Sequence, residues 1–398
     1  MAGPLEGLRV LDISTIIAAP LSGTLMADYG AEVVKAELPG VGDGLRGFPP
    51  QKDGKSLWWK NANRNKRFIS VDLRMPEGRD MILKMLPKFD VLLENFRPGT
   101  LDKWGLDKEA LWEACPRLVI LRATGFGQTG PYRDRRGFAK VFEAMAGLTY
   151  MTGDPDGVPM GVGYPIGDAI GGLFATTSVL AALLGMARGT IAQGEEIDLS
   201  LTEATFRVLD SQTISYDQTG EVASRNGNQS YYSAPANVFS TSDDQYVSLS
   251  GSTEAIFRAN ARAIGEPDLG DDPRFTTNVK RIENRPAIDK IFNAYFASHT
   301  AEEAIEAFTR EGGTLTPIYS IDRIFDDPQF QAREAITTAQ DDDFGEVRVQ
   351  NVVPKFSRNP GEVRHTARSL GRDNAAVFAE YLGLNEADLG ELSEKKVI

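Results

Sequence analysis

LRVLDISTIIAAPLSGTLMADYGAEVVKA, residues 8–36, is the stretch that determines the fold class. It contains an apolar run at 8–13, a helical segment from Pro20 to Tyr29, and a second apolar run at 31–36. Two short apolar runs on either side of a helix predict a strand–helix–strand unit. Strands joined in this way pair in parallel with a right-handed crossover. We therefore expect this segment to begin a parallel sheet that is covered by helices.

The alternation of strands and helices continues through the first third of the chain. Apolar runs at 68–73, 90–94 and 118–121 predict three further strands, and residues 77–88 carry apolar side chains at helical spacing. Ligands of a parallel sheet bind beyond the carboxyl ends of its strands. The section that follows, 127–167, is rich in Gly and Pro and shows little periodicity, which favours a functional loop.

The second half of the chain predicts a smaller α/β domain. A strand at 196–201 and the helix after it precede a polar segment, 225–234, which indicates a linker. The last part carries a hairpin pattern at 346–353 and two short helices after Leu370. We expect the fold class α/β, with a large Rossmann-like domain that contains the parallel sheet, a small α/β domain, and a C-terminal segment that returns to the large domain. Their expected limits are 1–224, 225–325 and 326–398.

The chain is acidic and has the composition of an ordinary globular protein. Its 398 residues include 43 Lys and Arg against 56 Asp and Glu, a formal net charge of −13, and 41% are hydrophobic. An acidic surface repels polyphosphate, so we expect no nucleic-acid partner, and an anionic ligand needs a local group of cations. The start of the chain lacks the basic and apolar regions of a secretory signal. We therefore expect a cytoplasmic protein.

Cysteine and histidine are scarce. Cys115 is the single cysteine, and the two histidines, His299 and His365, lie in the last quarter. This excludes an intrachain disulfide and a thiolate metal cluster, and no paired-ligand spacing predicts a metal site. The uncharged stretch 169–187 is nearly long enough to cross a bilayer, but its glycines and hydroxyl side chains favour a buried or interface helix. We therefore expect no membrane partner.

Two motifs have competing interpretations. Residues 125–130, GFGQTG, match the dinucleotide pattern G-x-G-x-x-G, but they run into a polar segment without helical periodicity, which favours a tight loop beside another ligand. A basic cluster leads into the strand at 68–73 and continues past it. This cluster is either a solvated loop face or a phosphate-binding group, and its spacing does not decide between them. Its members are Lys60, Arg64, Lys66, Arg67 and Arg74.

Asp168 follows Gly167 and immediately precedes the apolar stretch. An aspartate at this position either caps a helix by accepting backbone N–H groups or presents an exposed carboxylate nucleophile. The helix dipole favours the ionised carboxylate, and Gly167 leaves room for a bulky substrate. The chain contains no G-x-S-x-G motif, so serine–histidine chemistry is not indicated.

Several segments, in order along nearly the whole chain, resemble those of the family III CoA-transferases, the group related to formyl-CoA transferase and carnitine CoA-transferase. Each segment is a weak match by itself, but their common order makes the resemblance specific. The segments are LEGLRVLD at 5–12, AAP at 18–20, GAEVVKAE at 30–37, NRNK at 63–66, SVDL at 70–73, ENFRPG at 94–99, GFGQTGP at 125–131 and Gly167-Asp168.

The resemblance implies an acyl-CoA:carboxylate CoA-transferase that forms an interlocked homodimer and has no permanently bound cofactor. Acyl-CoA and a carboxylic acid are the implied substrates. Asp168 is the implied nucleophile, forming first a mixed anhydride and then an aspartyl-CoA thioester, and Glu143 is a further implied active-site residue. We also expect the basic cluster from Arg64 onward to attract the CoA phosphates. The implied CoA contacts are Ala18, Val71, Asp72, Leu73, Arg74, Asn95, Phe96, Arg97, Lys103 and Lys140.

Some residues depart from the pattern of formyl-CoA transferase. Thr15, Ile17 and Leu38 stand where that enzyme has His, Gln and Arg, and its mobile run of glycines has only Ser250-Gly-Ser252 as a counterpart. Oxalate and formyl chemistry are therefore not implied, and a larger or dicarboxylic acceptor is expected. The alternatives are an α-methylacyl-CoA racemase on the same fold and a non-catalytic CoA-binding protein. The racemase needs a His-Asp pair where this chain has Gly137-Phe-Ala139.

Overall fold

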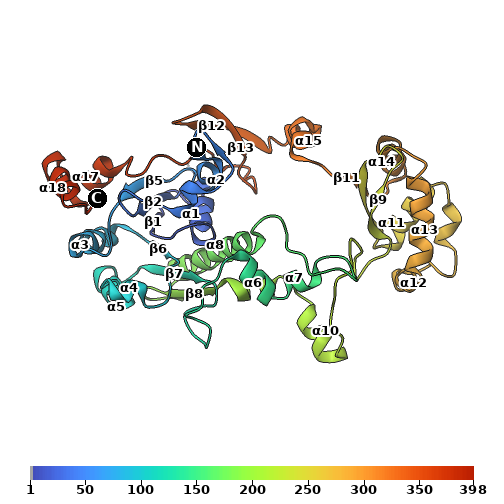
Figure 1. The fold of residues 1–398 in the computed structure, drawn as a ribbon, viewed down its shortest axis with the longest axis horizontal. Coiled ribbons are helices and arrows are strands. Elements are labelled where there is room, and N and C mark those ends of the chain that lie inside the picture. The colour runs from blue at the N-terminus through green and yellow to red at the C-terminus, as the bar shows by residue number, and fades with distance from the viewer. Residues whose placement is uncertain (1–2) are drawn as a thin grey trace. The chain divides into compact units, whose positions relative to one another are not determined.

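Six parallel strands form the main sheet of the computed structural model, which describes residues 3–398 (Figure 1). Their order across the sheet is β5-β2-β1-β6-β7-β8. The chain starts in the middle, winds to one edge, returns to the middle and winds to the other edge, which is the doubly wound Rossmann order. This confirms the predicted α/β class. The strands are β1 (Arg9–Asp12), β2 (Glu32–Glu37), β5 (Arg67–Ser70), β6 (Val91–Glu94), β7 (Val119–Thr124) and β8 (Glu196–Ser200).

Alternate side chains of the strands enter two separate cores. On β1, Val10 packs on one face of the sheet and Leu11 on the other. Because both faces are buried, the strands read as nearly continuous apolar runs. The helices packed on the first face are α1 (Ala18–Asp28) and α8 (Ile166–Ala187), and those on the second are α3 (Pro76–Met85), α5 (Lys108–Ala114) and α17 (Asn374–Leu382).

The chain divides into two units. The large unit contains the six-stranded sheet and comprises residues up to 148, 161–213 and 329–398, and the small unit comprises 149–160 and 214–328. The sequence-based limits of 225 and 325 lie close to these bounds. The short stretch 149–160 joins the small unit although it lies far from the rest of that unit in the sequence.

Helix α8 is the one described helix that is long and apolar enough to cross a membrane by length and composition. In the large unit it packs against α1 and the sheet. Gly172 allows the two helices to approach closely, because a Cβ there would lie 3.0 Å from the Ala18 carbonyl oxygen. The outward face of α8 is also apolar, and the side chains of Leu173 and Leu184 are more than half exposed.

Two segments of the chain differ from the sequence-based expectations. The predicted loop at 127–167 contains α6 (Ala139–Met145) and α7 (Leu148–Met151), which are too short for a helical period to show. The C-terminal hairpin begins earlier than predicted, because its first strand, ITTAQD, has few apolar residues. Its strands are β12 (Ile336–Asp341) and β13 (Gly345–Gln350), and the other elements here are β3 (Gln51–Lys52), β4 (Lys55–Ser56), α2 (Leu57–Ala62), α4 (Thr100–Lys103), α9 (Leu201–Arg207), α16 (Pro328–Ala332) and α18 (Glu386–Glu394).

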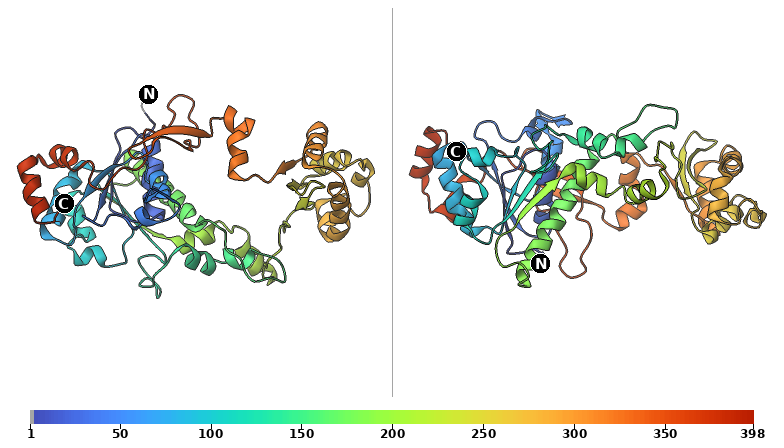
Figure 2. Two further views of the ribbon diagram at one scale, coloured as in Figure 1. Left: turned by 45° about the horizontal axis from the view of Figure 1, so that its top comes forward. Right: turned by 90° about the horizontal axis from the view of Figure 1, so that it is seen from below.

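The small unit packs helices on an antiparallel sheet in the order β11-β10-β9 (Figure 2). Phenylalanines from its strands and helices, among them Phe239, Phe257 and Phe292, form its core. A separate aromatic core explains why this part of the chain forms a unit of its own. Its elements are β9 (Ala236–Ser240), β10 (Tyr246–Ser250), β11 (Leu315–Pro317), α10 (Gln212–Thr219), α11 (Glu254–Ala263), α12 (Asn278–Glu283), α13 (Arg285–Phe296), α14 (Ala301–Glu311) and α15 (Ile321–Asp326).

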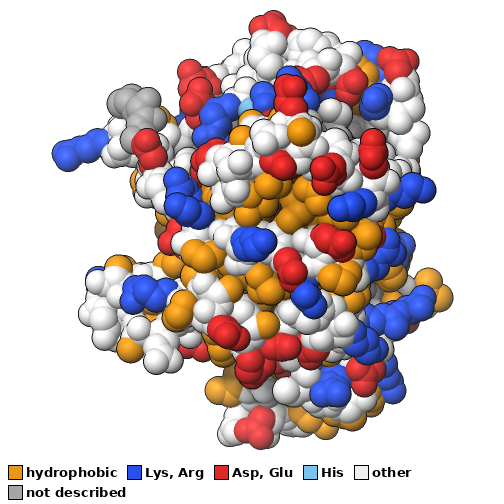
Figure 3. Space-filling view, turned by 90° about the vertical axis from the view of Figure 1, so that its left-hand side faces the viewer, with side chains coloured by type: hydrophobic (Ala, Val, Ile, Leu, Met, Phe, Trp, Pro, Cys, Tyr) orange, Lys and Arg blue, Asp and Glu red, His pale blue; other side chains and the backbone are white. Residues whose placement is uncertain are grey.

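The face of the large unit that carries α3, α17 and α18 has a mixed surface. Figure 3 shows acidic and basic side chains interspersed around exposed hydrophobic ones on this face. The cations drawn on this face are not gathered into one basic patch.

Candidate active site

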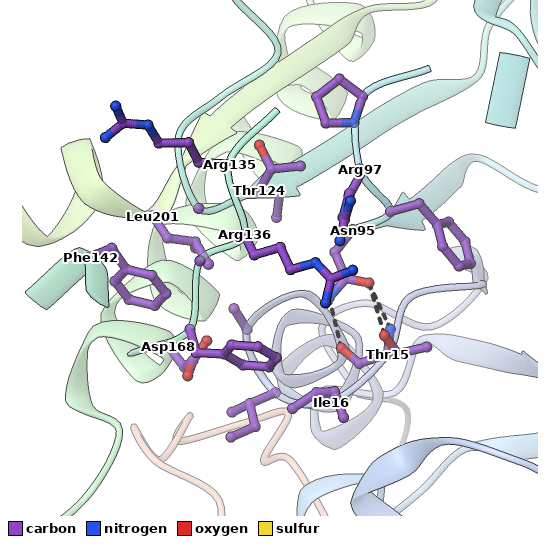
Figure 4. Close-up of a pocket in the computed structure, with 18 of the residues that line it drawn as sticks. Thr15, Ile16, Asn95, Arg97, Thr124, Arg135, Arg136, Phe142, Asp168 and Leu201 are labelled. Carbon is purple, nitrogen blue, oxygen red and sulfur yellow. Dashed lines mark hydrogen bonds between the residues drawn. The ribbon is translucent and has the colours of Figure 1, made fainter. Parts of the chain in front are cut away.

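The winding of the sheet reverses between β1 and β6, and a pair of hydrogen bonds joins the loops that follow these strands. The Thr15 N–H donates to Asn95 Oδ1 at 2.8 Å, and Asn95 Nδ2 donates to the Thr15 carbonyl oxygen at 2.7 Å (Figure 4). Open α/β sheets bind ligands at such a reversal, beyond the carboxyl ends of the strands. The two loops therefore mark the predicted binding edge.

A buried carboxylate holds the residue after Thr15 in an uncommon conformation. Ile16 has a φ of 70°, which β-branched residues rarely adopt, and its N–H donates to both carboxylate oxygens of Asp43 at 3.1 Å. Asp43 lies 3.3 Å from the Lys35 ammonium, which also donates to the Ser14 carbonyl oxygen at 2.6 Å. Backbone strain of this kind persists only where the surroundings enforce it, and it is concentrated at functional sites.

A cavity of about 320 Å³ lies beside this loop. Its apolar lining includes Ile16, Phe96, Phe142 and Leu201, and Asp168 is the one carboxylate among its described lining residues. The cavity thus combines an acidic group with cations and an apolar wall. The other polar side chains that line it are Thr15, Asn95, Thr124, Arg97, Arg133, Arg135 and Arg136.

Asp168 lies in the first turn of α8 but does not cap it. The N-cap residue is Pro165, and the Asp168 carboxylate makes no hydrogen bond or ion pair among residues 3–398. Burial raises the pKa of Asp168 to about 7, and the neighbouring Glu143 carboxylate adds to this shift. The predicted effect of the helix dipole, which favours ionisation, is therefore outweighed. The geometry leaves a carboxylate that lines the cavity without a hydrogen-bond or ion-pair partner among the described residues.

Glu143 supports the turn that presents Asp168. It is 2% exposed, and its Oε1 accepts the Gly167 N–H at 2.8 Å. The same glycine packs closely on α6, since a Cβ at position 167 would lie 2.5 Å from a ring carbon of Phe142. Glycine at this position thus serves packing, in addition to the substrate access expected from the sequence.

A second cavity, of about 280 Å³, adjoins the first, because Thr15 and Phe96 line both. Val71, Leu73 and Trp104 give it an apolar wall. At its rim, Arg74 Nη2 lies 2.6 Å from an oxygen of Asp72, and more than half of the Arg74 side chain is exposed. Two adjoining cavities at one sheet edge suit a long ligand.

Comparison with known proteins identifies the family of this chain. The profile of CoA-transferase family III matches residues 5–374. The chain belongs to this family. It is 40% identical over 396 residues to succinyl-CoA–D-citramalate CoA-transferase of Chloroflexus aurantiacus, which covers 99% of this chain and 98% of that protein. It is 32% identical to succinate–glutarate CoA-transferase of Agrobacterium fabrum, with 95% of each chain covered.

A solved structure supports the same assignment. The crystal structure of a CAIB/BAIF family protein from Brucella suis superposes with a TM-score of 0.84 at 32% identity, covering 96% of this chain and 100% of that one. The chain is therefore an acyl-CoA:carboxylate CoA-transferase, as its motifs predicted. Relatives with this activity disfavour the racemase and the non-catalytic alternative. The described residues that line the two cavities include no histidine.

The structure of this CoA-transferase brings most of the predicted site residues to the two cavities. Ala18, Asn95, Arg97 and Asp168 line the first, Val71 to Arg74 line the second, and Phe96 lines both. Lys103 on α4 and Lys140 on α6 line neither cavity, so their contact with CoA stays a prediction. Sequence reasoning did not select Thr124, Trp104 or the arginines at 133–136. The basic run after the glycine loop was the one available indication of those arginines.

The basic cluster at 60–67 is bound in ion pairs within the large unit, and all its members except the partly exposed Arg67 are buried, which makes both sequence-based interpretations of it wrong. Lys66 is 0% exposed and its ammonium lies 2.9 Å from Asp12, while Arg64 lies 2.6 Å from Asp28. Lys60 bonds two aspartates of the C-terminal hairpin region, and Arg67 pairs with Glu32 and Glu380. Buried charges need such partners. Only Arg74 of the cluster lines the second cavity.

Proposed function

We propose that this CoA-transferase works through covalent intermediates on Asp168 and exchanges CoA between dicarboxylic acids. The observation that carries the proposal is the Asp168 carboxylate, which faces the cavity without an ion pair or hydrogen bond among the described residues. A carboxylate held by a cation is a weak nucleophile, whereas one without a partner keeps its electron pair available. Burial, which raises the pKa of Asp168, also makes its ionised form more basic.

The reaction proceeds in four acyl transfers. The Asp168 carboxylate attacks the thioester carbonyl carbon, the carbon–sulfur bond breaks, and CoA thiolate leaves a mixed anhydride. The thiolate then attacks the aspartyl carbonyl carbon, which releases the donor acid as a carboxylate and leaves an aspartyl-CoA thioester. The acceptor carboxylate attacks the aspartyl thioester carbonyl carbon, which breaks the carbon–sulfur bond, releases CoA thiolate and forms a second mixed anhydride. The thiolate then attacks the acceptor acyl carbonyl carbon, which forms the new CoA thioester and releases the Asp168 carboxylate. No net proton transfer is required, so the cavity needs no general base.

Backbone donors at the start of α1 suit the oxyanions that form in each step. The N–H groups of Ile17 and Ala18 have no acceptor in the part of the chain that the structure describes, and both residues line the cavity of Asp168. Preorganised N–H donors of this kind stabilise a developing negative charge. The Asp43 contact that holds Ile16 sets the course of the backbone just before these donors.

The substrate class follows from the charge of the cavity and from the relatives. Arg97, Arg133, Arg135 and Arg136 outnumber the one carboxylate of the lining, which favours acids that carry more negative charge than a simple fatty acid. The names of the two relatives above, which act on citramalate and glutarate with succinyl-CoA or succinate, agree with a dicarboxylic donor and acceptor.

Chemical trapping tests the covalent role of Asp168. The protein is incubated with succinyl-CoA, quenched with hydroxylamine or borohydride, and digested for mass spectrometry. We expect a modified peptide that contains Asp168 only when the thioester is present, and Asp168→Asn should give no such peptide and less than about a thousandth of the turnover. Asp156→Asn, which changes an exposed carboxylate outside both cavities, is the matched control. Trapping at another side chain would contradict the proposal.

We also propose that the active form is an interlocked homodimer in the cytoplasm. Leu173 and Leu184 lie on one face of α8, and Phe206 and Val208 follow on and after α9, all with about half of the side chain exposed. Apolar faces of this kind are typical of subunit interfaces. Light scattering should give twice the chain mass at micromolar concentration, and the double change Leu173→Glu and Leu184→Glu should shift it toward the monomer. A monomeric wild-type protein would refute the dimer.

A further inference from the structure

The cavity beside Asp168 contains cations that differ in whether they already have a partner. Two of them are engaged within their own loop. Arg133 Nε lies 3.6 Å from a carboxylate oxygen of Asp134, and the Arg135 guanidinium lies 3.6 Å from the centre of the Tyr132 ring. Each contact gives the guanidinium a partner that a substrate anion would have to displace or share.

Arg136 is not engaged in this way. It makes no ion pair and no side-chain hydrogen bond within the described part of the chain. Figure 4 shows its side chain extended across the cavity with the guanidinium toward Thr15 and Asn95, whereas the guanidinium of Arg135 points away from it. Arg97 also has no side-chain partner among the described residues, but it belongs to the ENFRPG motif that the family resemblance assigns to CoA. Arg136 therefore remains for a different anionic group.

Thr124 provides an independent indication of a ligand in this cavity. It ends β7, is 8% exposed, and its hydroxyl oxygen is buried without a hydrogen-bond partner among residues 3–398. Buried polar groups in proteins are almost always hydrogen-bonded, so an unpartnered one that lines a cavity indicates a group supplied by the substrate. A carboxylate oxygen accepts from a hydroxyl and from a guanidinium at the same time.

We propose that Arg136 and Thr124 bind the remote carboxylate of a dicarboxylic substrate, the one that does not react with Asp168. The inference rests on the proposed function and adds the residues that select the acid. Donor and acceptor occupy the same place in turn, because each is joined to Asp168 or to CoA at that place. One guanidinium and one hydroxyl thus select both acids. An acid without the second carboxylate leaves the guanidinium and the hydroxyl unpaired, and this cost discriminates against monocarboxylic acids.

The test compares two thioesters that differ only in the remote group. Succinyl-CoA carries the second carboxylate, and butyryl-CoA has nearly the same chain length without it. For Arg136→Gln we expect kcat/KM with succinyl-CoA to fall roughly 10- to 100-fold while that with butyryl-CoA changes less than about threefold. Thr124→Val should lower the succinyl-CoA value about tenfold. Arg136→Lys should recover part of the preference, and Arg207→Gln, an exposed arginine that lines neither cavity, is the control.

The outcomes separate this inference from the proposed function. If Arg136→Gln weakens both thioesters and free CoA equally, Arg136 binds the CoA phosphates and the inference is wrong. The inference is also wrong if the ratio of the two thioesters does not change while Asp168→Asn still abolishes transfer, and in that case the proposed function stands. If the wild-type protein transfers CoA between no pair of acids, the proposed function itself fails. Thermal unfolding of each variant shows whether a loss reflects folding.

Discussion

Two basic stretches of this chain, 60–67 and 133–136, are similar in composition and opposite in environment. In the first, Lys60, Arg64 and Lys66 are buried, and each bonds a carboxylate from another part of the large unit. In the second, the arginines are exposed, and they line the cavity of Asp168. The stretch that precedes a strand of the sheet forms ion pairs inside the large unit, and the stretch in an irregular loop lines the cavity.

The difference shows that the partner of a charge decides its role. Removing a charge from water is costly unless an opposite charge replaces the lost hydration. A buried cation therefore stays paired with its carboxylate and does not bind a ligand. A cation at the surface of a cavity keeps its hydration and exchanges it for an anionic ligand. The carboxylates follow the same rule. Asp12 is buried between Lys35 and Lys66, whereas the Asp168 carboxylate has no ion pair among residues 3–398.

Changing Lys66 should have the largest effect. Lys66→Met leaves the buried Asp12 with Lys35 alone, and we expect the free energy of unfolding, measured by urea denaturation, to fall by about 3 to 5 kcal/mol. The control Arg135→Met, at an exposed position, should change it by no more than about 0.5 kcal/mol. A stable Lys66→Met protein with weakened CoA binding would remove the distinction between the two stretches.

The pH dependence of the rate should reflect the unpaired carboxylate. Because the nucleophile must be ionised and burial raises the pKa of Asp168 to about 7, kcat/KM should fall about tenfold for each pH unit below 7. Glu143→Gln removes a neighbouring charge and keeps an oxygen for the Gly167 N–H, so the acidic limb should move to lower pH. For Asp12, burial alone raises the pKa, but the two lysines outweigh it and hold the pKa below its usual value. If the acidic limb lies at the same pH in the wild type and in Glu143→Gln, the limb reports a group other than Asp168.

Asp43 links the buried network to the cavity, so its effect should be intermediate. Asp43→Asn keeps an acceptor for the Ile16 N–H but loses the charge that faces Lys35. We expect kcat to fall about tenfold because the loop shifts relative to Asp168, and we expect the KM for acyl-CoA to change less than kcat although Asp43 also lines the second cavity. Asp53→Asn, an exposed aspartate, is the control. A rise of KM by about tenfold with an unchanged kcat would instead mean that Asp43 acts in substrate binding.

The smallest effect concerns stability. A folded-state pKa raised above the unfolded value means that the protonated form of Asp168 is favoured on folding. This contribution is fully present below the unfolded pKa of about 3.9 and is lost as pH rises through about 7. Asp168→Asn should therefore be more stable than the wild type by about 1 kcal/mol at pH 8, a value kept low because the carboxylate is partly solvated. Thermal melts from pH 4 to 8 should show the gain appear and then level off.

The local pattern of the sequence was enough to predict the α/β class, the first strands and helices, and a long apolar helix beside Asp168. The structure begins this helix at Ile166, so Asp168 lies within its first turn and not before it. Apolar runs and helical spacing act over a few residues, so they are visible without the fold. The family motifs were visible for the same reason, because each is short and follows the chain order. The prediction failed for α6 and β12, whose segments are too short or too polar to carry a clear period.

Only the tertiary structure decided which charges are buried and which face a ligand. Arg64 meets Asp28 across 36 residues of sequence, and Lys60 meets Asp341 across 281. Glu143 and Asp168 come from different helices, and their proximity and burial raise the pKa of Asp168 against the helix dipole. Desolvation and the Coulomb interaction depend on the distances between side chains in space. The sequence therefore determined the fold class and singled out Asp168, and packing between distant segments determined which cations are buried in ion pairs and which line the cavity.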